Sequence, residues 1–234
     1  MYQQHEVKYV ALLSSLPSAE RLFQAKQTPI SRLKLEQRLS ALEPPERRVL
    51  ESIEGVLDRR FVDVAKDDEE VLQRATEALK QIKHQTLRNI LVQRLDMRTL
   101  VKALRLKHVN SGEPPLSAWG FSRWCRHIES HWNEPGFALV HVFPWVSEAQ
   151  HFIINNQPLK LEKLLLQQAY NSLVRHGGQH HFDFEAVVIY VLKWNIINRQ
   201  VKYNSMAAER RFTHLITQGI AHLITDMETS AYGE

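Results

Sequence analysis

Residues 180–203 of the chain read HHFDFEAVVIYVLKWNIINRQVKY, and this stretch decides the fold. Asp183 can cap a helix, with Glu185 in the first turn, where free backbone N–H groups and the helix dipole favour negative charge. From Phe184 to Val191 nearly every side of the helix is apolar, so this half must be surrounded by protein. A β-branched run also suits a buried strand, but a length of roughly six helical turns favours the helix.

Beyond Leu192 the side chains separate into two stripes at helical spacing. The apolar stripe consists of Trp194, Ile197 and Val201, and the polar stripe of Asn195, Asn198, Arg199 and Lys202. This pattern predicts a helix that passes through a core and then leaves along a surface able to bind a partner.

Helical spacing recurs along the rest of the chain, with short connections and no strand–helix alternation. Helices are predicted from Ser31, from Pro45, from Asp68, over residues 87–106, 121–132, 161–173 and 212–227, and before Ile154, with Asp96 as a possible internal cap. Residues 9–16 fit either a strand or a short helix. We therefore expect an all-α fold, a compact multi-helix bundle or funnel of similar helical units without an extensive sheet. Residues 1–110 and 111–234 form an N-terminal and a C-terminal helical part, or one continuous domain.

The composition is that of an ordinary globular chain. Of its 234 residues 44% are hydrophobic and 24% charged, and the formal net charge of +4 suits an acidic partner or a solvated basic surface. The single cysteine, Cys125, excludes an internal disulfide and suits a reducing compartment. No secretory signal or membrane-spanning stretch is visible, which predicts a cytoplasmic protein.

Motifs for nucleotide binding and hydrolysis are missing from the sequence. It contains no G-x-x-x-x-G-K-[ST], no G-x-G-x-x-G and no G-x-S-x-G. A metal site is conceivable at His127 and His131, which share a helix face near Cys125. A further ligand would have to come from His141, His151, His176, His180 or His181. Because nothing selects one, we predict no metal and no cofactor.

Two other clusters have functional and structural interpretations. His180 and His181 followed by Asp183 and Glu185 suit acid–base chemistry, but we favour the interpretation as the start of a helix, with two loop histidines and carboxylates that complement the helix dipole. Four tryptophans with interleaved arginines suit single-stranded nucleic acid, yet two of them fall on an apolar stripe and are expected in the core. The residues concerned are Trp119, Trp124, Trp132 and Trp145, with Arg123 and Arg126.

Two helical segments share a short pattern. Residues 94–100 read RLDMRTL and residues 193–199 read KWNIINR, so both run basic, large apolar, Asp or Asn, apolar. As a repeat this is a short signal, but a duplicated helical unit would suit a docking scaffold.

These segments also carry a resemblance to a known family. Residues 184–199 are similar to the acidic–apolar–Tyr–apolar–basic–polar–Asn pattern of the C subunits of V/A-type ATPases, which in eukaryotes are the d subunits. Residues 96–105, DMRTLVKALR, resemble that family's Asp-x-x-Asn-Leu-x-x-x-Leu-Arg helix, with Thr99 in place of Asn. More closely, the chain resembles a bacterial group of proteins associated with V-type ATPases, also through residues 9–17, 94–98, 143–145 and 182–198.

The resemblance implies an all-helical, funnel-like protein of the central stalk that catalyses nothing. Such a protein couples the rotating shaft to the membrane rotor ring during ion or proton transport, and it lies at the cytoplasmic face of the inner membrane. Its partners would be the shaft subunits and the ring. The residues expected to dock are Asp96, Arg98, Arg105, Asn195, Asn198 and Arg199. The alternatives are a histidine-based metal-dependent enzyme and a helical single-stranded nucleic-acid-binding module.

Overall fold

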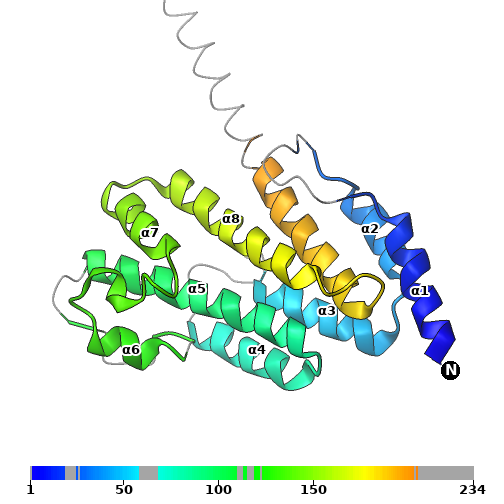
Figure 1. Cartoon of the computed structure of the whole chain (residues 1–234), viewed down its shortest axis with the longest axis horizontal. Helices are drawn as coiled ribbons and strands as arrows, with labels where there is room; N and C mark the ends of the chain where they lie inside the picture. The colour runs from blue at the N-terminus through cyan, green and yellow to red at the C-terminus, as the bar shows by residue number, and fades with distance from the viewer. Residues whose placement is uncertain are drawn as a thin grey trace, which may run out of the picture.

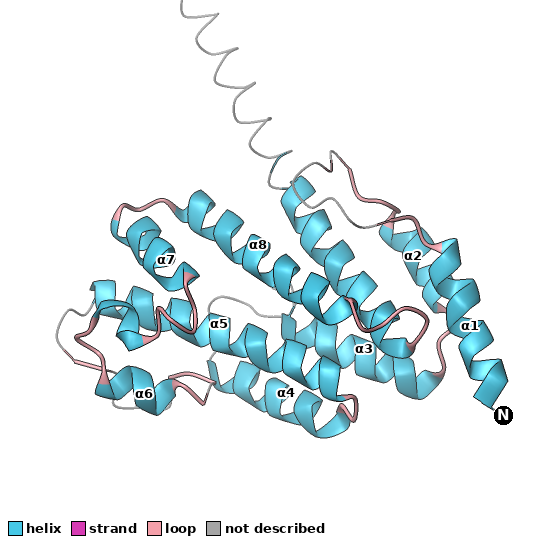
Figure 2. Cartoon of the chain, viewed as in Figure 1, coloured by secondary structure: helices cyan, strands magenta, loops and turns pink. Residues whose placement is uncertain are grey.

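The computed structural model describes residues 2–18, 25, 27–57, 68–109, 113–114, 119–121, 123–202 and 204. Its labelled elements are α1 (Tyr2–Ser15), α2 (Arg32–Leu39), α3 (Pro44–Leu57), α4 (Asp68–Gln81), α5 (Gln85–Val109), α6 (Cys125–Ser130), the 3₁₀ turn η2 (Pro135–Ala138), α7 (Trp145–Ile154) and α8 (Pro158–Gly177). A further helix over residues 184–202, unlabelled and orange in Figure 1, follows α8. These ranges contain no strand (Figure 2), which confirms the all-α prediction.

Several helices begin where their sequence signals predict. The Ser31 hydroxyl accepts the backbone N–H of Lys34 and so caps α2. Proline suits the first turn of a helix, and α3 accordingly starts at Pro44. Asp183 Oδ1 accepts the Ala186 N–H at 2.8 Å, which confirms Asp183 as the cap of helix 184–202.

Two predicted boundaries are wrong, and one open alternative is resolved. Helix α5 runs unbroken from Gln85 to Val109 with Asp96 buried in its middle, so Asp96 does not start a new helix. The predicted helix 121–132 is confined to Cys125–Ser130, since the Phe121 N–H is held by the Thr99 hydroxyl of α5 at 3.1 Å. Residues 9–15 are helical, as part of α1.

The apolar interior consists of two clusters that share α5 and α8. One joins α1–α4, the first half of α5, the end of α8 and helix 184–202. The other joins the second half of α5 with α6, η2, α7 and the start of α8. In Figure 1, α5 and α8 accordingly extend from the part around α6 and α7 toward the part around α1–α4. The two clusters do not divide the chain at residue 110. Whether residues 1–110 and 111–234 fold independently stays a prediction.

The first half of helix 184–202 is enclosed as predicted. Val187, Val188 and Val191 are fully buried, and Trp194 at the change of pattern is only 2% exposed. The predicted helix 212–227 lies outside the described residues. None of the helices that the structure describes has both the length and the apolar character needed to cross a bilayer.

Candidate functional site

The polar stripe of helix 184–202 borders a pocket of about 150 Å³. The pocket lies where this helix meets the end of α3, the first half of α5 and the second half of α8. Its apolar walls are Leu57, Ile90, Leu173, Leu192 and Ile196, and its polar lining is Arg94, Asn195, Asn198, Arg199 and Lys202. The two segments with the shared sequence pattern therefore meet at one pocket.

Positive charge dominates the pocket. Three basic side chains line it, and among the described lining residues none is acidic. Arg199 forms an ion pair with Glu162 of α8, a carboxylate that lies beside the pocket rather than on its wall. Three basic groups and one carboxylate therefore give this region a net positive formal charge.

Arg94 is the least compensated of these cations. It follows Leu87, Ile90 and Leu91 on the inward stripe of α5, and among the described residues it has no hydrogen-bond or ion-pair partner. Burial, and then repulsion from Arg199, lower the pKa of Arg94 to about 10, while attraction to Glu162 opposes them. The guanidinium therefore keeps its charge at neutral pH in an environment that disfavours it.

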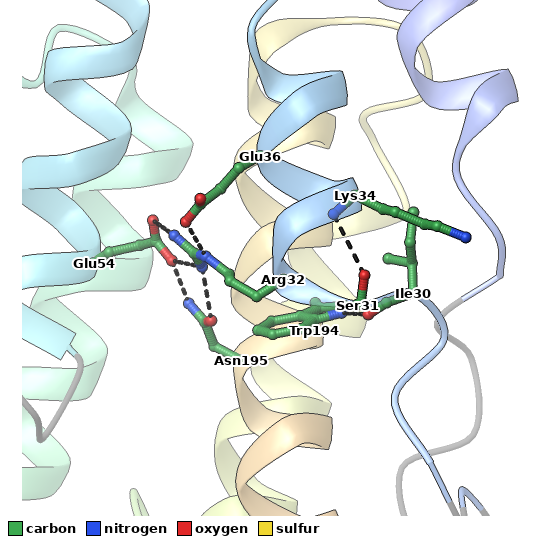
Figure 3. A network of polar contacts seen from close by, with 8 residues as sticks. All are labelled: Ile30, Ser31, Arg32, Lys34, Glu36, Glu54, Trp194 and Asn195. Carbon is green, nitrogen blue, oxygen red and sulfur yellow. Dashed lines mark hydrogen bonds and ion pairs between the residues drawn. The ribbon is translucent and has the colours of Figure 1, made fainter.

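Asn195 has a different set of contacts on the neighbouring face of the helix (Figure 3). Glu54 of α3, buried, accepts the Asn195 amide at 2.7 Å and the Arg32 guanidinium at 2.8 and 3.3 Å. Arg32 of α2 also donates to the Asn195 carbonyl oxygen at 3.5 Å. Hydrogen bonding to Glu54 raises the pKa of Arg32. Asn195 thus helps to fasten α2 and α3 to helix 184–202.

The other predicted residues of this helix face the pocket. Asn198 and Arg199 are half-buried in its lining, and Lys202 is exposed there one turn later. Three of the six predicted docking residues, Asn195, Asn198 and Arg199, are therefore brought together.

The three predicted residues on α5 lie elsewhere. Asp96 is 1% exposed, and its Oδ2 is 3.8 Å from Nε of Arg123. Arg98 borders a separate cavity of about 20 Å³ together with Trp119 and Phe121. Arg105 is exposed further along the helix. The structure does not join these side chains to the pocket.

Sequence reasoning missed Arg94 and its surroundings. A signal was present, because Arg94 stands seven residues after Leu87 at a position of the apolar stripe. Lys202 was recognised in the polar stripe but not as a site residue. The carboxylates Glu54 and Glu162 had no signal, since their partners are far away in sequence.

The structure does not favour the histidine pair or the tryptophans as sites. The rings of His127 and His131 stack at 4.1 Å, and their nitrogens contact backbone oxygens of Phe137 and His127. Among the described residues no third ligand joins them. Trp119, Trp132 and Trp145 are buried, so these rings are unavailable for base stacking.

Comparisons with known proteins identify no relative. No protein-family model matches the chain, and no curated protein or solved structure matches it significantly.

Proposed function

We propose that this protein is a non-catalytic subunit of a bacterial V/A-type rotary ATPase that couples the rotating shaft to the membrane rotor ring. It would lie at the cytoplasmic face of the inner membrane, with shaft subunits and the ring as partners. The sequence resemblance motivates the proposal, and the all-helical fold is compatible with it.

The observation that carries the docking role is the charged guanidinium of Arg94 in the pocket, which has no partner among the described residues. Arg94 is half-buried, so its charge has lost part of its hydration without gaining a partner among the described residues, and an anionic group that enters the pocket would compensate for this loss. Arginine is well suited to receive it, because its planar donors bind a carboxylate in a bidentate manner.

The pocket also defines what the partner must present. Apolar walls and a volume of about 150 Å³ fit one acidic side chain with its stem, or the terminal carboxylate of a polypeptide. Lys202 at the exposed margin adds attraction during the encounter. We therefore propose that an acidic, partly apolar segment of the shaft docks here.

Affinity purification of the full-length protein from its native cells tests this proposal. We expect the wild type to recover shaft or ring subunits, and Arg94→Met to recover far less. Arg175→Met is the matched control, because Arg175 is exposed on α8 and does not line the pocket. Recovery of neither kind of partner by the wild type would refute the assignment.

If Arg94→Met and Arg175→Met both fail to recover the partners, binding depends on the overall positive charge of the protein. This result would refute the role of the pocket. Genes adjacent on the chromosome offer an independent check. We expect them to encode rotary ATPase subunits.

A further inference from the structure

Three side chains able to bind a metal meet at the start of helix 184–202, at the opposite end of this helix from the pocket, and a further histidine lies beside them. His84, in the turn between α4 and α5, has its Nδ1 2.7 Å from Glu185 Oε1, although the two residues are 101 positions apart. His180 Nδ1 is 2.6 Å from Asp183 Oδ2. One ligand atom from each of His180, Asp183 and Glu185 lies within 4.8 Å of the others. One imidazole and two carboxylates from residues 180–185 thus converge, and His84 contacts them through Glu185.

Neighbouring groups orient these ligands. In the ion-free geometry His180 Nδ1–H donates to Asp183 Oδ2. When a cation replaces that proton, Nε2–H can donate to the Thr86 hydroxyl, 2.9 Å away, and hold the ring in place. Asp183 uses Oδ1 to cap the helix, which leaves Oδ2 facing His180. A hydrogen bond on the far ring nitrogen is the usual way to orient a metal-binding histidine.

The charge of this cluster also calls for a cation. Asp183 and Glu185 bring two carboxylates together, and among the described residues neither pairs with a lysine or arginine. Their only charged partners there are the two histidines, which compensate them only when protonated. A divalent cation would neutralise both carboxylates while accepting the lone pair of His180.

We propose that His180, Asp183 and Glu185 form a divalent-cation site of the zinc type, with His84 orienting the Glu185 carboxylate from outside. Nitrogen and oxygen donors of this kind suit Zn²⁺, whose bonds to them are about 2.0–2.2 Å long. Tetrahedral ligation would place the three ligand atoms about 3.3 Å from one another, and they now lie within 4.8 Å of one another. His84 and Asp183 are each 41% exposed, which leaves an entry path.

The site would keep one coordination position open. Three protein ligands leave the fourth position of a tetrahedral zinc ion to water or to a further ligand. The bound ion would fasten the loop that carries His180 to the start of helix 184–202. This inference is independent of the proposed ATPase role.

Zinc titration of the metal-free, tag-free, full-length protein by calorimetry tests the inference. We expect one equivalent to bind, and His180→Ala and Glu185→Gln to weaken binding by at least about tenfold. His181→Ala is the matched control, because this exposed histidine adjoins the cluster without belonging to it. Zinc should raise the unfolding midpoint of the wild type and control only.

Cobalt substitution of the wild type supplies a readout that needs no variant to fold. Intense visible absorption bands, displaced by one equivalent of zinc, would support a tetrahedral site. Weak octahedral bands, absence of stoichiometric zinc binding, or binding that survives Glu185→Gln but is lost in a His127→Ala/His131→Ala variant would each overturn the proposal.

Discussion

Helix 184–202 carries two polar clusters that differ in how their charge is balanced. Toward α2 and α3, Glu54 accepts hydrogen bonds from both Arg32 and Asn195, so the cationic and anionic groups compensate each other (Figure 3). Toward α5, the carboxylate of Glu162 pairs with Arg199 and only attracts Arg94 from a distance. The balanced cluster stabilises the packing of the helices. The unbalanced cluster leaves the Arg94 cation able to bind an anionic group from outside the described residues.

Glu54→Ala should produce the largest effect. It leaves Arg32 and the Asn195 amide without their shared acceptor, and we expect the free energy of unfolding in urea to fall by about 3 kcal/mol. That is near the low end for buried pairs, because the Arg32 side chain is 34% exposed. Glu36→Ala removes an exposed partner of the same arginine and should cost about 0.5 kcal/mol or less. Equal losses in both variants would contradict the comparison.

Trp194→Phe should have the next largest effect. Trp194 Nε1 donates to the Ile30 carbonyl at 2.8 Å in the interior beside the balanced cluster. Loss of this donor leaves a buried acceptor unsatisfied and should lower the free energy of unfolding by about 1–2 kcal/mol. Tyr190→Phe removes an exposed hydrogen bond of the same length, to Pro17. If Tyr190→Phe lowers the free energy of unfolding as much as Trp194→Phe does, burial of the hydrogen bond does not explain the loss.

Arg94→Met should act in the opposite direction. Removing this half-buried charge, which lacks a partner among the described residues, while keeping the apolar stem is expected to raise the free energy of unfolding by up to about 1 kcal/mol. Arg199→Met should lower it slightly instead, because the ion pair with Glu162 is then lost. Urea denaturation of both variants measures the signs. A destabilised Arg94→Met would show that Arg94 is compensated within the chain.

Protonation of His176 should give the smallest effect. Its Nε2 is 3.3 Å from the neutral Gln93 side chain, and burial, followed by repulsion from Arg175 and His180, lowers its pKa. On acidification the unfolded chain therefore takes up this proton first, so stability is lost as the pH falls below about 6.5 and is retained above it. Urea denaturation across this range should show a shallower decline for His176→Gln. His181→Gln, altering an exposed histidine, should leave the decline unchanged.

Local features of the chain were predictable to different degrees. The Ser31 and Asp183 caps follow from side-chain hydrogen bonds to nearby N–H groups, and the burial of residues 184–191 follows from their continuous apolar surface. The boundary error at residues 121–132 arose because Thr99, 22 residues away, holds the Phe121 backbone. No local pattern reports such a contact.

The candidate site shows the same division. Sequence alone determined that Asn195, Asn198 and Arg199 share one stripe, because helical periodicity places them there. Only the tertiary structure decided that Asn195 is bound to Glu54 across 141 residues while Arg94 has no partner among the described residues. The physical reason is that a charge is compensated, or left desolvated, by the helices packed against it, and periodicity within one helix carries no information about its neighbours.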